Sequence, residues 1–203
     1  MDFVFITQWL GTAGVVAFYP IQNWRLFLTR NPIGLSFFAF CLLSVGVAGY
    51  LALGLHLGLR GLAAGNAVNF FFVGVILTLL WFRSEALRLP ERIAGLTVLL
   101  AGLGGLALVN LWGPGGFAEG FSGWLGLGGV VAFYPVQNFD LFRKKDPRGL
   151  SLLAFGVLAV GAAFYTLLGF LVRDVTVIIG NGFATLGALL TIYLILRYAI
   201  KDR

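Results

Sequence analysis

The chain has 203 residues, of which 60% are hydrophobic and 11% are charged, and its mean hydropathy is +0.96. So few charged side chains could not cover the apolar surface of a water-soluble fold, and long apolar runs without period-two alternation exclude a membrane β-barrel. The net charge of +6 comes from short basic clusters between apolar runs, so it indicates membrane orientation and not nucleic-acid binding.

The sequence predicts an all-α integral membrane protein with seven apolar segments, each long enough to cross a bilayer. These predicted transmembrane helices cover residues 4–28, 35–57, 61–83, 92–112, 122–143, 150–172 and 175–197. Turn-forming residues separate them, notably around Pro32, Pro90, Pro114 and Pro147. We expect no cleavable signal peptide, because the first segment lacks a basic start and a small-residue cleavage site.

The chain contains an internal repeat with an offset of 115 residues. The stretch VVAFYPIQN at Val15–Asn23 returns as VVAFYPVQN at Val130–Asn138, and the similarity extends without gaps from Trp9–Arg83 to Trp124–Tyr198. The fourth segment belongs to neither copy, so it turns the second repeat to cross the membrane in the same direction as the first. The predicted architecture is 3+1+3 with parallel repeats: a triple-helix unit at 1–84, a linker helix with its loops at 85–121, and a second triple-helix unit at 122–203.

The lysines and arginines support seven segments and predict their orientation. With seven spans, the side that holds the N-terminus carries only Arg60 and Arg173. The other side carries Arg25, Arg30, Arg83, Arg88, Arg92, Arg143, Lys144, Lys145, Arg148, Arg197, Lys201 and Arg203. The positive-inside rule then predicts an external N-terminus and a cytoplasmic C-terminus, and we expect the protein in the cell membrane.

Each repeat combines a P-x-Q-N stretch with a later G-L-S, at Pro20–Asn23 with Gly34–Ser36 and at Pro135–Asn138 with Gly149–Ser151. These motifs resemble the PQ-loop superfamily, and the 3+1+3 repeat resembles its sugar-transporting SWEET branch, whose single-repeat SemiSWEET relatives work as dimers. The resemblance covers nearly the whole chain. It implies passive alternating-access transport, or uniport, of a small polar, sugar-like solute through a pathway that one chain completes.

The proline of each motif stands one residue upstream of its place in the family, where this chain has Ile21 and Val136. A proline inside a helix removes a hydrogen bond and costs ~3 kcal/mol unless neighbours compensate. Two interpretations of these prolines, Pro20 and Pro135, remain open: a hinge for alternating access, or a static kink that improves packing. Their neighbours Gln22 and Gln137 either satisfy the carbonyls that the kink frees or face the pore.

Polar and aromatic residues recur at repeat-related positions inside the membrane: Tyr50 and Tyr165, and Asn66 and Asn181. The asparagines either face a central cavity or join helices by hydrogen bonds worth about 0.6 kcal/mol each. In SWEET-like proteins an asparagine on the third helix and a tryptophan on the second bracket the sugar. The resemblance implies this solute-binding role for these four residues, with tyrosine in place of tryptophan. Asn69 has Ala184 as its repeat mate, so the polar lining is expected to be asymmetric.

Two pairs of charged residues are candidate gates. Arg25 and Asp140 are repeat mates just beyond the P-x-Q-N stretch, where an ion pair between them would close the cytoplasmic side. Arg173 and Asp174 follow the sixth segment, where related proteins place polar groups of an outer gate. The alternative for both pairs is contact with lipid headgroups.

The sequence has no phosphate-binding loop, no cluster of metal ligands and no acidic residue in the middle of a predicted span. We therefore expect no enzyme activity, no cofactor and no metal; the expected partners are the solute and the lipid bilayer. A homo-oligomer is compatible with the sequence but not needed for a pathway. The competing hypothesis is a receptor or lipid-handling protein on the same fold, which the basic cluster Arg143, Lys144, Lys145 and Arg148 keeps open.

Overall fold

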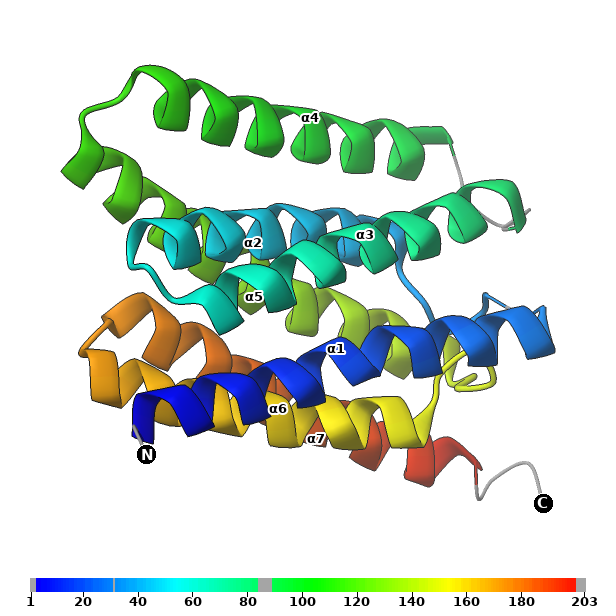
Figure 1. Ribbon diagram of the computed structural model, residues 1–203. Helices are drawn as coiled ribbons and strands as arrows, with labels where there is room; N and C mark the ends of the chain where they lie inside the picture. Colours follow the sequence, from blue (N-terminus) through cyan, green and yellow to red (C-terminus); the bar gives the residue numbers. More distant parts are fainter. Residues whose placement is uncertain (1–2, 31, 84–88, 200–203) are drawn as a thin grey trace.

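The computed structural model describes residues 3–30, 32–83 and 89–199, and these form seven α-helices (Figure 1). They are α1 (Phe3–Thr29), α2 (Phe37–His56), α3 (Arg60–Arg83), α4 (Leu89–Trp112), α5 (Gly115–Lys144), α6 (Leu152–Val172) and α7 (Val175–Ala199). All of them except α5 are long and apolar enough to span a membrane. Glycines and polar residues dilute the apolar residues of α5. The predicted all-helical integral membrane protein is confirmed.

One predicted boundary is wrong. We expected the fifth helix to begin near residue 122, but α5 begins at Gly115, directly after Pro114. Pro114 lacks an amide hydrogen and so cannot continue α4, yet it is well tolerated at the start of the next helix. The G-P-G-G stretch at 113–116 is therefore a tight connection and not a loop, and the predicted linker region contains the first turns of α5.

Each repeat folds into a triplet in which the third helix lies between the first two. α3 packs against α1 and α2, and α7 packs in the same way against α5 and α6. The two triplets meet where α1 packs on α6 and α2 packs on α5. These two interfaces are equivalent, because the repeat exchanges α1 with α5 and α2 with α6. α4 lies on the outside of the bundle against α2, as Figure 1 shows, so the 3+1+3 arrangement is confirmed.

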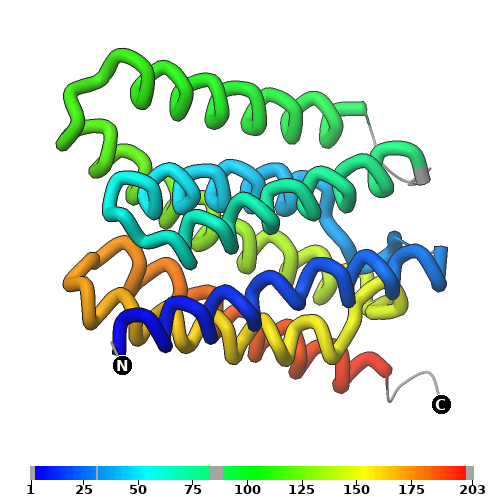
Figure 2. The backbone as a smooth tube through the Cα atoms, in the orientation of Figure 1, coloured from blue at the N-terminus to red at the C-terminus, as the bar shows by residue number. Residues whose placement is uncertain are grey.

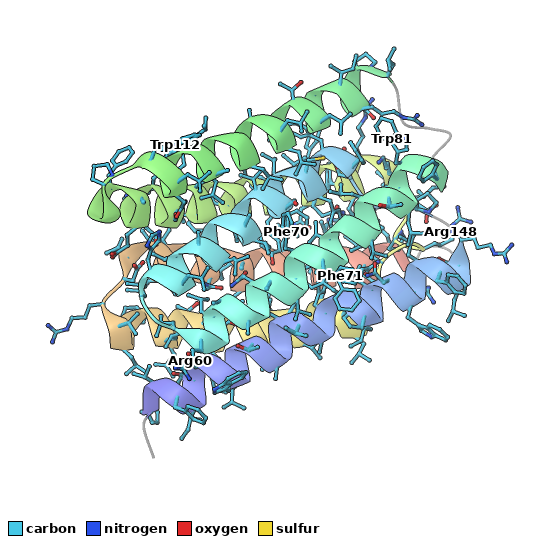
Figure 3. The ribbon with its side chains drawn as sticks, turned by 45° about the horizontal axis from the view of Figure 1, so that its top comes forward. Arg60, Phe70, Phe71, Trp81, Trp112 and Arg148 are labelled. Atoms are coloured by element: carbon cyan, nitrogen blue, oxygen red, sulfur yellow. The ribbon has the colours of Figure 1, made fainter. Side chains whose placement is uncertain are left out.

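The connections alternate between the two ends of the bundle. In Figure 2 the N-terminus shares one end with the α2–α3, α4–α5 and α6–α7 connections, and the described chain finishes at the other end. Arg60 and Arg148 lie at opposite ends in Figure 3, as the predicted distribution of basic residues requires. Three residues of that distribution, Arg88, Lys201 and Arg203, lie outside the described residues.

The two triplets approach each other closely at two pairs of glycines. A Cβ atom added to Gly14 of α1 would lie 2.6 Å from the Cα atom of Gly161 in α6. A Cβ atom added to Gly129 of α5 would lie 2.5 Å from the Cα atom of Gly46 in α2. The pairs are repeat mates, so both interfaces are backbone-to-backbone crossings of the kind that small residues permit in membranes.

We predict that Gly161→Ala destabilises the protein by about 1–3 kcal/mol, because the new methyl group must push α1 away from α6. The matched control is Gly182→Ala, at a helical glycine whose added Cβ would meet nothing within 4 Å. That change is expected to be neutral or to stabilise by ~0.5–1 kcal/mol. Thermal unfolding of the detergent-solubilised protein measures both, and equal melting temperatures would contradict the crossing.

Candidate functional site

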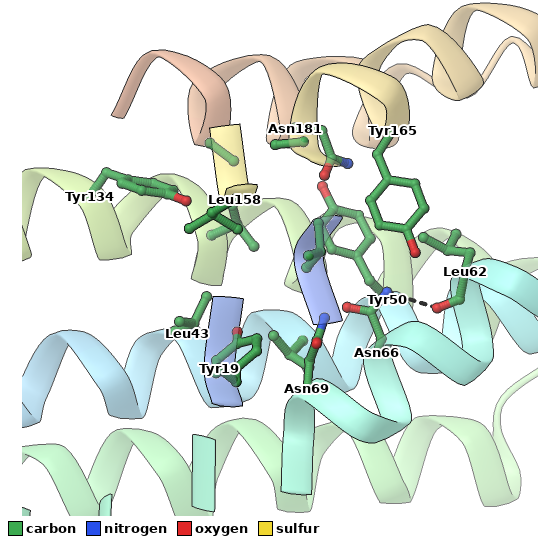
Figure 4. A pocket seen from close by; sticks show the side chains of 15 residues that line it. Tyr19, Leu43, Tyr50, Leu62, Asn66, Asn69, Tyr134, Leu158, Tyr165 and Asn181 are labelled. Carbon is green, nitrogen blue, oxygen red and sulfur yellow. Dashed lines mark hydrogen bonds between the residues drawn. The ribbon is translucent and has the colours of Figure 1, made fainter. Parts of the chain in front are cut away.

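A cavity lies at the centre of the bundle, where the two triplets face each other (Figure 4). Most of its lining consists of repeat mates: Val15 and Val130, Tyr19 and Tyr134, Leu43 and Leu158, Val47 and Ala162, Tyr50 and Tyr165, and Asn66 and Asn181. Asn69 and its mate Ala184 also line the cavity. The structure thus brings all five predicted solute-binding residues to one place.

The cavity is small in this conformation. Its volume is about 40 Å³. By the same measure, a cavity needs ~10–15 Å³ to hold one water molecule. A few waters would fill it, and a sugar would not fit. A solute of that size can enter only after the triplets have moved apart.

Two tyrosines join the triplets on the side of the cavity nearer the N-terminal end of the bundle. The Tyr50 hydroxyl of α2 donates to the carbonyl oxygen of Thr176 in α7 at 2.7 Å. The Tyr165 hydroxyl of α6 lies 2.8 Å from Thr12 Oγ1 in α1. The Thr12 hydroxyl in turn lies within donating distance of two carbonyl oxygens of its own triplet, those of Gln8 at 2.7 Å and Gly61 at 2.8 Å. Tyr50 thus bonds directly to the backbone of the opposite triplet, whereas Tyr165 bonds to a side chain of the opposite triplet. We call the two contacts between the triplets, Tyr50 with Thr176 and Tyr165 with Thr12, the tyrosine latch.

Glycines of the opposite triplet make room for both tyrosines. A Cβ atom added to Gly11 would lie 2.6 Å from Tyr165 Cδ1, and one added to Gly65 would lie 2.8 Å from Tyr165 Oη. The repeat mates Gly126 and Gly180 make room for Tyr50 in the same way. Both tyrosine side chains are buried. In this conformation they therefore hold the triplets together, and their hydroxyls are already engaged.

The asparagines Asn66 and Asn181 do not join helices. Asn66 Nδ2 donates to the carbonyl oxygen of Leu62, and Asn181 Nδ2 donates to that of Val177, one turn earlier on the same helix in each case. Among the described residues their Oδ1 atoms have no hydrogen-bond partner, although both side chains line the cavity. The alternative of interhelical hydrogen bonds is therefore wrong, and two acceptor oxygens are left available to a solute.

Two glutamines close the opposite side of the cavity. Gln22 Nε2 donates to the carbonyl oxygen of Gly149 at 2.7 Å, and Gln22 Oε1 accepts from the Ser151 amide at 3.0 Å. Its mate makes the same two contacts with the other loop, from Gln137 to Gly34 and Ser36. Each glutamine is fully buried and binds the α1–α2 or α5–α6 loop of the opposite triplet. We call these four contacts the glutamine latch; neither interpretation from the sequence anticipated it.

No family model and no curated protein matches the sequence. Among solved structures, a match is "The 3.7 A resolution structure of a eukaryotic SWEET transporter", with a TM-score of 0.66 and 16% identity, covering 98% of this chain and 97% of the other. The chain has the SWEET fold. The resemblance read from the P-x-Q-N repeats is thereby confirmed at the level of the fold.

Within the SWEET fold, the charged residues have other partners than predicted. Asp140 pairs with Lys144 on its own helix at 3.3 Å, and the expected pair with Arg25 is not formed between the described residues. Asp174 caps α7 by accepting from the Val177 amide at 2.9 Å. Arg173 ends α6 in a left-handed conformation with φ 58°. In this conformation the predicted gate residues act locally, at helix ends.

The prolines lie inside continuous helices, and both side chains are exposed on the outer surface of the bundle, away from the cavity. The structure thus places Pro20 and Pro135 where they can bend α1 and α5 without touching a solute. Their hinge role stays a prediction.

Sequence reasoning missed Tyr19 and Tyr134, whose side chains line the cavity from α1 and α5. A signal was present, because both belong to the stretch that is repeated almost letter for letter. The spacing of four residues from Val15 to Tyr19 places both on one helix face. Thr12 was also missed, and its mate Leu127 carries no hydroxyl, so no repeated pattern marked it.

We predict that Gln22→Ala lowers the free energy of unfolding by about 1–3 kcal/mol, because it removes two buried hydrogen bonds and leaves their partners unpaired. Gln22→Glu keeps the acceptor for Ser151 but loses the donor to Gly149, and its effect should differ from that of alanine. The control is Thr97→Ala, at an exposed residue that bonds only to its own helix. Equal melting temperatures for Gln22→Ala and the control would refute the latch.

Proposed function

We propose that this protein is a passive uniporter that moves a small, neutral, sugar-like solute across the cell membrane by alternating access. Its central cavity is the solute site. The observation that carries the proposal is that polar contacts between the triplets, and not within them, close this cavity on both sides. Contacts of that kind break and reform when one triplet rocks against the other.

The lining of the cavity supports a neutral solute. Its polar groups are the amides of Asn66, Asn69 and Asn181 and the hydroxyls of four tyrosines, and no charged side chain is among the lining residues described. Amides and hydroxyls suit hydroxyl groups of a solute, whereas an ion would be left without a counter-charge. The solved structure with a similar fold is a SWEET transporter, which supports transport and not catalysis for this chain.

The two latches support alternation. A hydrogen bond contributes about 0.5–1.5 kcal/mol net, so the two bonds of the tyrosine latch cost about 1–3 kcal/mol to open and the four bonds of the glutamine latch about 2–6 kcal/mol. Opening one latch while the other stays closed gives two states that differ by two hydrogen bonds, about 1–3 kcal/mol, a gap small enough for a passive carrier to populate both. With the N-terminus outside, the tyrosine latch would close the external side and the glutamine latch the cytoplasmic side.

A lipid-handling function has one observation in its favour. A groove of about 490 Å³ lies between α6 and α7 on the outer surface, lined by apolar side chains with Thr166 and Thr185. Its lining shares no residue with the central cavity. Two cations of the basic cluster, Lys144 and Arg148, are engaged with Asp140 and Asp146. The amides and hydroxyls that line the central cavity therefore favour transport.

We predict that purified protein in proteoliposomes takes up radiolabelled glucose or sucrose down its gradient. Asn181→Ala should reduce the initial rate about tenfold, the equivalent of 1.4 kcal/mol of lost solute interaction. Thr97→Ala should leave the rate unchanged. Unchanged uptake in Asn181→Ala would remove the cavity as the solute site.

The hinge gives a second prediction, for Pro20→Ala. Alanine restores an amide that can bond to the preceding turn, so the melting temperature should rise while uptake falls, because α1 no longer bends. The control is Pro90→Ala, at an exposed proline in the first turn of α4, where a missing amide costs little. Unchanged uptake in Pro20→Ala would favour the static kink.

A further inference from the structure

Asn69 is a fully buried side chain whose amide has no partner. Its exposed fraction is 0%, and neither Nδ2 nor Oδ1 has a hydrogen-bond partner within the part of the chain that the structure describes. It lies on α3, about one turn from Asn66, and lines the central cavity. Figure 4 shows it pointing from α3 into the space that the labelled side chains surround.

The other asparagines of the bundle interior each donate at least one hydrogen bond to the protein, although the Oδ1 atom of Asn23 is also buried without a partner among the described residues. Asn138 Oδ1 accepts from the Thr191 hydroxyl at 2.7 Å, and its Nδ2 donates to the carbonyl oxygen of Gly187 at 3.2 Å. Asn66 and Asn181 donate to their own helix. Buried polar groups in folded proteins are almost always paired, and one that is not calls for an explanation outside the fold itself. For Asn69 that explanation is a ligand in the cavity.

Asn69 also breaks the two-fold symmetry of the cavity. Its repeat mate is Ala184, which lines the cavity from α7 and carries no polar group. The other polar lining residues come in pairs, the tyrosines as well as Asn66 and Asn181. A solute in a symmetric site could bind in two orientations related by the pseudo-axis. A single amide on one side makes these two orientations different in energy.

We propose that Asn69 is the residue that selects and orients the solute, by pairing with two neighbouring hydroxyl groups on it. The amide Nδ2 donates to one solute oxygen, and Oδ1 accepts from the adjacent hydroxyl, which is the match that an amide offers to a vicinal diol. This inference rests on the proposed transport function. A site built to bind a hydroxyl rejects an analogue that lacks it, because the amide would stay unpaired.

The first test is discrimination between radiolabelled glucose and its monodeoxy analogues in proteoliposomes. The wild-type protein should carry glucose about tenfold faster than at least one analogue, and Asn69→Ala should reduce that ratio to about two or below. A ratio that Asn69→Ala leaves unchanged would overturn the assignment. A general loss of rate with the ratio preserved would also count against it.

The repeat supplies a second test, which moves the amide across the pseudo-axis. The double variant Asn69→Ala with Ala184→Asn places the same group at the mate position of a nearly symmetric cavity. It should restore most of the discrimination that Asn69→Ala loses, with the solute turned over. No restoration would contradict the orienting role.

A third test needs no transported solute. If Asn69 is unpaired in the protein, Asn69→Leu should leave the melting temperature unchanged or raise it, whereas Asn138→Leu should lower it by breaking two hydrogen bonds. A fall for Asn69→Leu as large as that for Asn138→Leu would make Asn69 a structural residue. If the wild-type protein carries none of the sugars, the proposed function fails, and this melting comparison still decides for or against a ligand-facing Asn69.

Discussion

The close approach of two backbones, at Gly14 with Gly161 and at Gly46 with Gly129, is the constraint on which the rest of the structure depends. Side chains placed there would clash with the facing backbone and hold the triplets apart. With glycines, the helices touch near the middle of the bundle, so a tyrosine on one triplet can reach the backbone of the other. The small closed cavity and both latches follow from that contact.

The two halves of the bundle have similar backbones, but their side chains differ at some equivalent positions. Such differences are possible because both halves belong to a single chain. Gln8 accepts from the Gly61 amide in the first half, whereas Gly123 leaves room for Thr176 at the equivalent place in the second. The pair has exchanged a large and a small residue across the same gap. Such exchanges preserve packing while they remove symmetry, which allows one side of the cavity to differ chemically from the other.

The sequence was sufficient to predict the fold, because its strongest signals are the length of the apolar segments and an ungapped repeat. Both signals determine the path of the backbone. It was insufficient for contacts across the pseudo-axis. Repeat mates such as Arg25 and Asp140 lie at equal depth, but depth does not say which way a side chain faces. Gln22 and Leu26, four residues apart, form the buried stripe of α1, and Arg25 lies exposed beside it. The glutamine side chains face the opposite triplet, and the charged side chains do not.

The geometry also gives a physical reason why this chain has tyrosine where SWEET proteins have tryptophan. The hydroxyl of Tyr50 extends beyond its ring to a carbonyl of α7, in a space left by Gly180. The broader ring system of tryptophan would not fit against the same glycine without displacing α7. In the proposed transport cycle, a tyrosine thus closes the site while its hydroxyl is bound to protein, and the hydroxyl would become available to a solute when the triplets part. One residue type can therefore act as a latch in the closed state and as a solute contact in the open one, which makes closure and binding compete for the same hydroxyl.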